Sequence, residues 1–292
     1  MAPAPRETLD CSVPNENVRE AVRLALAEDV GSGDATTLSV VPPQANGRAV
    51  LRAREALVVC GLAFFEEAMR QVDPEIVVEP NQEEGSEAEP GAIVATITGA
   101  LASILTGERV ALNFVQRLSG VATLTRRYVQ AVAGTGAGIY DTRKTTPGWR
   151  AFERYAVRVG GGRNHRFGLD DMILIKDNHL ASLPDDGIDP VARAIYLARG
   201  RFPHLRVQVE ADRPEQAIAA AEAGADLVLL DNMSPDTMRE VVAAIGERSE
   251  TEASGGIQLN TVAEVARSGV DRISVGALTH SAPSVDFGLD ID

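Results

Sequence analysis

The sequence predicts an α/β protein in two parts: an N-terminal α+β domain, then a series of βα units that form a barrel or a doubly wound sheet. Four short apolar runs in the second half, at 138–140, 172–175, 207–209 and 227–230, are typical of buried parallel strands. Helical segments with recognisable ends lie between these runs. A polar residue follows each run directly, as in βα barrels, whose active sites lie at the carboxyl ends of the strands.

The first half lacks this regular alternation. An amphipathic helix is expected over residues 17–28, where apolar side chains recur on one stripe. Strands are expected at 48–54, 57–60, 76–79 and 93–98, with a helix at 63–71. Residues 81–91 are expected to form a polar, acid-rich turn, and a long helix is expected from about Val110 through Leu124. This order favours an α+β domain.

Capping residues mark the helix ends in the second half. Asp212 and Glu215 are predicted to form a capping box at the start of one helix. Ser234 is predicted to cap the next helix, with Pro235 at its first position. Stop glycines are expected at 224, 246 and 269, and a last unit has a helix at 261–267 and a strand at 272–275.

Composition and charge narrow the class of protein. The chain has 292 residues, 45% of them apolar, which can fill a sizeable core. A formal net charge of −14 would repel nucleic acid and anionic membranes at long range. No apolar run reaches the roughly 20 residues of a membrane helix, and the first ten residues do not resemble a signal peptide, so a cytoplasmic protein is expected. Cys11 and Cys60 have no disulfide or metal-ligand spacing and read as ordinary thiols.

Cations gather locally against this acidic background. Seven Lys and Arg side chains lie between Arg143 and Arg166, with Glu153 as the one acid among them, which suggests a pocket for a small anion. The arginines spaced every four residues from 150 to 158 also fit a solvated helix face. The chain has only two lysines, Lys144 and Lys176, and both fall in segments that follow a predicted strand.

The polar residues at the strand ends form the candidate site. Those that directly follow strands are Asp141 to Lys144, Lys176, Glu210, Asp231 and Gly276, and in a barrel they converge at one mouth. Arginine forks and lysine charges suit a doubly anionic ligand, while Glu210 and Asp231 suit ribose hydroxyls or a metal ion. Two late loops, one of them Ser254, Gly255 and Gly256 and the other beginning at Gly276, offer backbone N–H groups to a phosphate.

The four histidines have different contexts. His165 lies inside the basic cluster, where a substrate-binding role is expected. His179 follows Lys176 closely, and both a role beside the site and a loop hydrogen bond remain open. His204 and His280 have no clear partners and read as structural.

Six longer runs carry a family resemblance. They are Glu28–Thr37, Asn113–Thr123, Asp141–Arg150, Gly160–His179, Leu229–Pro235 and Ala253–Ile257. On these runs the chain resembles quinolinate phosphoribosyltransferase, in the right order and over most of its length. The resemblance implies transfer of phosphoribosyl from phosphoribosyl pyrophosphate to quinolinate with decarboxylation, giving nicotinate mononucleotide, pyrophosphate and CO2 in de novo NAD biosynthesis.

The same resemblance implies a fold and an assembly. An N-terminal α/β sandwich domain over residues 1–112, joined by the C-terminal tail 281–292, would accompany an open α/β, TIM-like barrel over residues 113–280. The implied assembly is a homodimer, or a higher oligomer built from it, in which Arg109 reaches the neighbouring site.

Roles for the candidate residues also follow from the resemblance. Those implied to bind the quinolinate carboxylates are Arg109, Arg143, His165, Arg166 and Lys176, with Lys144 between quinolinate and pyrophosphate. Glu210 and Asp231 would lie by the ribose and its magnesium ion. The 5′-phosphate would contact Ser254, Gly255, Gly256 and Gly276. Lys144, Lys176, Glu210 and Asp231 are the implied catalytic residues. One departure is visible: Gln208 stands where the family usually has glutamate.

Three other functions remain open on the sequence. A nicotinate phosphoribosyltransferase handles one carboxylate and should need fewer cations. An aldolase could form a Schiff base on Lys176. A non-catalytic relative, such as those associated with molybdate transport, would bind a ligand only, but such relatives tend to lack the lysine that this chain has at 176.

Overall fold

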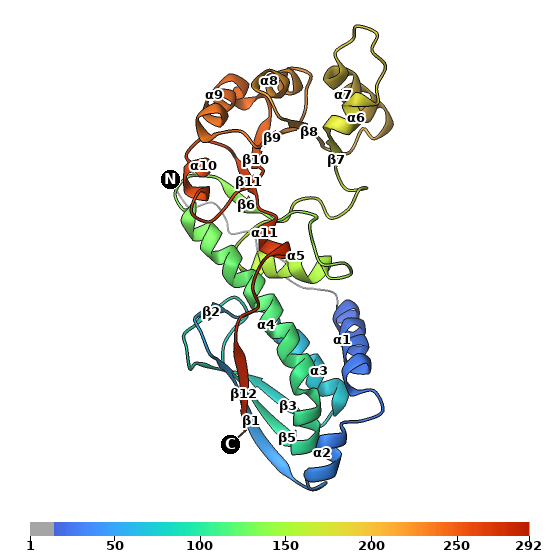
Figure 1. Cartoon of the computed structure of the whole chain (residues 1–292), viewed down its shortest axis with the longest axis vertical. Helices are drawn as coiled ribbons and strands as arrows, with labels where there is room; N and C mark the ends of the chain where they lie inside the picture. The colour runs from blue at the N-terminus through green and yellow to red at the C-terminus, as the bar shows by residue number, and fades with distance from the viewer. Residues whose placement is uncertain (1–14, 292) are drawn as a thin grey trace. The chain divides into compact units, whose positions relative to one another are not determined.

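The computed structural model describes residues 15–291, which divide into two compact units (Figure 1). The first unit contains the chain up to residue 123, then 148–160 and the segment from 282 onward. The second contains 124–147 and 161–281. The sequence analysis placed the change of domain near residue 112 and did not separate 148–160 from the barrel.

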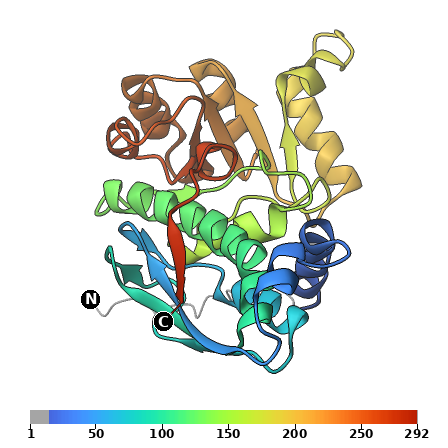
Figure 2. The same ribbon diagram turned by 60° about the horizontal axis from the view of Figure 1, so that its bottom comes forward.

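An antiparallel sheet in the order β12-β1-β5-β3 forms the base of the first unit. Its strands are β1 (Asn46–Ala53), β3 (Val77–Pro80), β5 (Ile93–Ala100) and β12 (Phe287–Ile291). The last strand of the chain pairs with β1 from Ala49 opposite Ile291 to Ala53 opposite Phe287, and Figure 2 shows this red strand alongside the first sheet. A small ribbon joins β2 (Leu57–Val58) to β4 (Glu87–Ala88), so the polar turn expected over 81–91 also contains a short strand.

Helices complete the first unit. They are α1 (Asn15–Val30), α2 (Ala35–Val40), α3 (Leu62–Val72), the first part of α4 (Leu101–Ala131) and α5 (Arg150–Val159). The ring of Phe64 on α3 stacks on Phe114 of α4 at 5.2 Å and meets Phe152 of α5 edge-on at 4.9 Å. Trp149 stacks on Phe114 at 5.1 Å. These aromatic contacts hold residues 148–160 in the first unit, although their neighbours in sequence belong to the second.

A six-stranded parallel sheet in the order β6-β11-β10-β9-β8-β7 forms the second unit. Its strands are β6 (Gly138–Tyr140), β7 (Ile173–Ile175), β8 (Val207–Ala211), β9 (Leu227–Asp231), β10 (Glu250–Ser254) and β11 (Arg272–Ser274). The earliest strand lies beside the last, so the sheet wraps round as a barrel does. Within the described residues β6 and β7 are edge strands, and the backbone of Arg163 bridges Tyr140 at the open seam. The predicted open α/β barrel with an N-terminal α+β domain is confirmed.

Helices follow the strands of this barrel, and their ends test the predicted caps. They are α6 (Asp177–Ala181), α7 (Pro190–Arg201), α8 (Pro214–Glu222), α9 (Pro235–Ile245), the 3₁₀ turn η1 (Gly246–Arg248), α10 (Val262–Ala266) and α11 (Ala277–His280). Ser234 caps α9 by accepting the Thr237 N–H, as predicted. The capping box at Asp212 is wrong, because Arg213 occupies the cap of α8 and makes no side-chain cap bond.

Two further predictions concern membranes and thiols. No helix within residues 15–291 combines the length and the apolar character needed to cross a bilayer. Cys60 is buried in the first unit, and Cys11 lies outside the described residues.

Candidate active site

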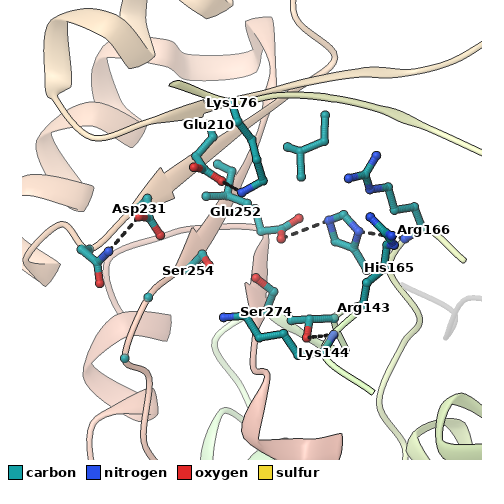
Figure 3. Close-up of a pocket in the computed structure, with 16 residues that line it drawn as sticks. Arg143, Lys144, His165, Arg166, Lys176, Glu210, Asp231, Glu252, Ser254 and Ser274 are labelled. Carbon is teal, nitrogen blue, oxygen red and sulfur yellow. Dashed lines mark hydrogen bonds and ion pairs between the residues drawn. The ribbon is translucent and has the colours of Figure 1, made fainter. Parts of the chain in front are cut away.

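A pocket of about 610 Å³ opens at the carboxyl ends of the barrel strands (Figure 3). Its lining residues all belong to the second unit: Thr142, Arg143, Lys144, His165, Arg166, Leu174, Lys176, Glu210, Leu229, Asp231, Asn232, Glu252, Ser254, Gly255, Gly256 and Ser274. Ten of the twelve candidate residues therefore line one cavity. Gly276 is not in the lining but lies beside it, because a Cβ built there would be 3.1 Å from Lys144 Cδ. Arg109 lies on α4 in the first unit and is not in the lining.

Strand geometry explains why these side chains meet. Asp231 and Ser254 are the last residues of β9 and β10, and Lys176 directly follows β7. Parallel strands in register bring such end positions to the same rim of a barrel. There Lys176 forms an ion pair with Glu210 of β8, whose side chain is 19% exposed. The pair puts a cation and an anion side by side at the mouth.

Arginines supply most of the positive charge on another side of the pocket. Arg143 follows β6, and Arg166 lies in the segment that returns after α5. Burial, and then the nearby charge of Arg143, lower the pKa of Arg166, while Asp171 opposes the shift. An arginine stays protonated after such a shift, so the Arg166 guanidinium keeps its positive charge in the pocket beside Arg143.

A buried aspartate holds the segment that carries Arg166. Asp141 is fully buried directly after β6. Its two carboxylate oxygens accept the Asn164 side-chain N–H at 2.6 Å and the His165 backbone N–H at 2.7 Å. The guanidinium of Arg166 also donates to the Met172 carbonyl at 3.0 Å. These bonds position the basic segment against the barrel.

Glycine is needed in the loop after β10. Gly255 has a φ of +95°, and a Cβ built there would lie 2.2 Å from Asn232 Oδ1. Asn232 has a φ of 55°, the one positive φ of a non-glycine residue in the described chain, and its N–H donates to the Ser254 carbonyl at 2.9 Å. Its side chain donates to Asp231 at 2.7 Å. The strained asparagine and the glycine together bring bare backbone to the pocket.

The sequence analysis missed a deeper layer of the pocket except for Gln208, which it noted only as a departure from the family pattern. Glu252, Ser274, Leu174 and Leu229 line it, and Gln208 is buried beneath it. Each of these five residues lies two positions before a predicted site residue that is at, or just beyond, the end of its strand. Because alternate residues of a strand share a face, counting back by two from each strand end was the signal that could have found them.

The histidines divide by their contacts. His165 is 8% exposed; its Nδ1 accepts the Arg166 backbone N–H at 2.8 Å and its Nε2 lies 3.1 Å from Gln208 Oε1. His179 Nδ1 accepts the Lys176 backbone N–H at 2.9 Å, which is the loop hydrogen bond left open above. His280 lies closer to the site than expected, because its Nε2 would be 3.0 Å from a Cβ built on Gly276.

The candidate metal ligands are oxygen atoms. Among residues 15–291, no three His, Cys, Asp or Glu side chains gather closely enough to hold an ion by themselves. Glu210 and Asp231 do line the same pocket. Magnesium is commonly held by one or two carboxylates together with substrate phosphates, so this pair fits that ion.

Two family models together match nearly the whole described chain. The model of the quinolinate phosphoribosyl transferase N-terminal domain matches residues 34–119, and that of the C-terminal domain matches residues 121–290. The chain belongs to the quinolinate phosphoribosyltransferase family. The predicted membership is confirmed, and both halves of the family's architecture are present.

Individual members of the family cover almost all of this chain. The probable nicotinate-nucleotide pyrophosphorylase (carboxylating) of Bacillus subtilis is 40% identical over 265 residues, which is 90% of each protein. The chloroplastic nicotinate-nucleotide pyrophosphorylase (carboxylating) of Arabidopsis thaliana is 37% identical over 299 residues, covering 96% of this chain and 84% of the relative. The solved structure of the nicotinate-nucleotide pyrophosphorylase from Francisella tularensis has a TM-score of 0.90 at 36% identity, covering 96% of this chain and 98% of that one.

Proposed function

We propose that the pocket at the barrel mouth carries the reaction of this family: phosphoribosyl transfer from phosphoribosyl pyrophosphate to quinolinate with decarboxylation. The observation that supports it most is that a single cavity is lined by cationic side chains and by carboxylates. Four cations, Arg143, Lys144, Arg166 and Lys176, share it with a carboxylate pair, Glu210 and Asp231. A dicarboxylate and a ribose phosphate need those two kinds of partner.

The quinolinate end of the pocket is assigned to the cations. Arg143 and Arg166 present planar forks suited to bidentate carboxylate binding, and Lys176 adds a compact charge. His165 lines the same pocket, accepts the Arg166 backbone N–H on Nδ1, and is assigned to the same carboxylates. We assign Arg109 of the partner subunit to the same carboxylates, which makes a homodimer, or a higher oligomer built from it, the functional assembly.

The phosphoribosyl end is assigned to the other wall. Glu210 and Asp231 face the ribose, and the Ser254–Gly256 loop with Gly276 receives the 5′-phosphate on backbone N–H groups. Lys144 lies beside Gly276 and reaches the pyrophosphate. Glu210 and Asp231 would also hold magnesium, which supplies positive charge to the leaving pyrophosphate.

The chemistry then follows from positioning and charge. The lone pair of the pyridine nitrogen forms a bond to the anomeric carbon while the bond from that carbon to pyrophosphate breaks, and pyrophosphate leaves with the electron pair. Glu210 and Asp231 stabilise the positive charge that develops on the ribose, and the arginines hold the ring for in-line attack. In the nucleotide, the bond to the adjacent carboxylate breaks as CO2 leaves, its electron pair stays on the ring carbon, where the neighbouring ring cation stabilises it, and that carbon then takes up a proton.

The ion pair of Lys176 bears on the aldolase alternative. Lys176 is paired with Glu210 at the pocket mouth, and the chain belongs to the quinolinate phosphoribosyltransferase family, which transfers phosphoribosyl groups. We therefore set that alternative aside. The cytoplasmic address expected from the sequence stays a prediction.

A coupled assay tests the proposed function. Purified protein with quinolinate, phosphoribosyl pyrophosphate and magnesium should release nicotinate mononucleotide and CO2 in equal amounts. Turnover of nicotinate in place of quinolinate would reassign the substrate. Calorimetric binding of quinolinate without turnover would indicate the non-catalytic relative.

A further inference from the structure

One residue of the pocket has a backbone conformation that favours a different amino acid. Asn232 directly follows β9 and lines the cavity, and its φ of 55° is the one positive φ of a non-glycine residue within residues 15–291. Side chains with a Cβ are strained in that conformation, whereas glycine is not. Glycine would form this turn without the strain. Strain at a binding site therefore directs attention to what the asparagine side chain does there.

The side chain of Asn232 contacts its neighbour Asp231. The two meet at 2.7 Å, and since a carboxylate only accepts hydrogen bonds, the atom that faces Asp231 Oδ2 is the amide nitrogen. Figure 3 draws this bond as the dashed line at Asp231. Among the residues that the structure describes, no side chain or backbone group donates to the other oxygen, Oδ1. The protein thus holds one oxygen of Asp231 and leaves the other to a ligand.

The same amide group lies against the loop after β10. A Cβ built on Gly255 would be 2.2 Å from Asn232 Oδ1 and 2.5 Å from Asn232 Cγ, so the bare Cα of this glycine packs on the amide. The Asn232 backbone N–H donates to the Ser254 carbonyl at 2.9 Å. One residue therefore joins the end of β9 to the Ser254–Gly256 loop, through both its backbone and its side chain.

We propose that Asn232 is a positioning residue for the phosphoribosyl end of the pocket. Its amide holds Asp231 Oδ2, so that Oδ1 is presented to the ribose, and its contact with Gly255 sets the distance from that oxygen to the phosphate loop. Asn232 acts through Asp231 and does not itself bind the substrate. The substrate and the role of Asp231 rest on the proposed function, whereas the bond between the two side chains does not.

Asn232→Gly is the direct test, because glycine adopts the positive φ and keeps the backbone bond to Ser254 while the amide is lost. Its urea midpoint should stay close to that of the wild type. With each ligand titrated alone in a calorimeter with magnesium, the Kd for phosphoribosyl pyrophosphate should rise roughly tenfold, as for a lost hydrogen bond to a charged group. The Kd for quinolinate should not change. An unchanged Kd for phosphoribosyl pyrophosphate in the folded variant overturns the proposal.

A control in the same loop separates positioning from stability. Ser234 lies two residues further along, outside the pocket lining, and caps α9 by accepting the Thr237 N–H. Ser234→Ala should lower the urea midpoint, because the helix loses its cap, and should leave both Kd values unchanged. Asn232→Gly should show the reverse. A parallel loss of stability and affinity in both variants would mean that this loop acts only through folding, and would contradict the proposal.

A double-variant cycle tests whether Asn232 acts through Asp231. Asp231→Ala removes the acceptor of the amide, so adding Asn232→Gly to it should not raise the Kd for phosphoribosyl pyrophosphate any further. Losses that multiply in the double variant would mean that the amide contacts the substrate directly, and a positioning role would be wrong.

The outcomes keep this inference apart from the proposed function. A wild-type protein that does not bind phosphoribosyl pyrophosphate would end the proposed function and this inference with it. Normal binding and turnover in the wild type, with no loss of affinity in Asn232→Gly, would end this inference alone.

Discussion

Lys144 and Arg143 are neighbours in sequence with different settings in the pocket. Arg143 is half-buried, whereas Lys144 is exposed and its backbone carbonyl accepts the Thr279 hydroxyl at 2.8 Å. A desolvated planar fork suits a carboxylate, and a solvated ammonium on a flexible stem suits a pyrophosphate that must leave. Replacing each of the two residues by alanine should therefore change different kinetic constants.

Arg143→Ala and Lys144→Ala should each lower kcat/KM at least roughly 100-fold, because each removes charge that binds the reacting groups. The arginine variant should also lose quinolinate affinity, and the lysine variant should mainly lose kcat. Steady-state kinetics and urea unfolding measure both effects. Arg239→Ala is the control, since Arg239 pairs with Asp236 on α9 outside the pocket. Near-normal rates in either site variant would remove that residue from the mechanism.

At the scale of elements, α4 packs tightly against the segment that leads into β12. A Cβ built on Gly120 would lie 2.0 Å from the Pro283 carbonyl oxygen. Nearby, Arg117 donates to the Ala282 carbonyl at 2.6 Å and to Glu153 at 2.7 Å. The end of the chain is thus held against α4 before it enters the first sheet.

Gly120→Ala should destabilise the protein by about 1–3 kcal/mol, because the backbone at Pro283 must move to admit a methyl group. Gly200→Ala is the matched control: Gly200 lies in α7 with nothing within 4 Å of a built Cβ. Alanine there should stabilise by about 0.5–1 kcal/mol, from the helix propensities of the two residues. Urea unfolding measures both changes, and equal stability of the two variants would contradict the close contact.

A buried carboxylate also links α1 to α3. Glu67 on α3 has a side chain that is 9% exposed and pairs with Arg70 and, at 3.7 Å, with Arg19 of α1. Burial raises its pKa, but hydrogen bonds from Gln71 and Arg70 and the charges of Arg70 and Arg19 outweigh it and leave the pKa lowered. A carboxylate with a lowered folded-state pKa stabilises the fold at pH values above its unfolded pKa.

Glu67→Gln should therefore cost about 1 kcal/mol of unfolding free energy near neutral pH. The difference from wild type should be complete above the unfolded glutamate pKa of about 4.3 and should disappear as the pH falls through the lower folded value. Urea titrations over a pH series measure it. A difference that grows on acidification would mean that the sign of the shift is wrong.

For the whole molecule, charge is distributed unevenly. The net charge is −14, yet the pocket wall presents Arg143, Lys144, Arg166 and Lys176. A local cationic field within an acidic protein draws in small anions while the rest of the surface repels large ones.

Mixing two inactive variants tests the shared site. If the proposed homodimer shares its sites, Arg109→Ala and Lys144→Ala should each be inactive alone, because each removes one partner's contribution to every site. Hybrid dimers would carry one intact site in two, so an equal mixture after subunit exchange should regain about one quarter of wild-type activity. No recovery in a mixture shown to contain hybrids would place Arg109 outside its partner's site.

The sequence by itself determined five of the six barrel strands, the residues that follow them and the family, but not β10 (Glu250–Ser254). These features depend on local patterns: apolar runs, turn residues and the motifs around Lys144, Lys176 and Asp231 can be read without knowing what packs against them. The N-cap at Ser234 was predicted for the same reason. The capping box at Asp212 was not found, because the chain enters α8 one residue later, at Arg213.

Only the tertiary structure decided which side chains lie beneath the rim and where the barrel stays open. Glu252, Gln208 and His165 come from three segments that are distant in the sequence. Their hydrogen bonds depend on the register of the strands, which decides the face of the sheet on which each side chain lies. Residues 148–160 belong to the first unit because of aromatic contacts such as that of Trp149 with Phe114. The basic residues of this segment gave no indication of those contacts. Pairing and packing across long sequence separations are properties of the fold, and no local pattern encodes them.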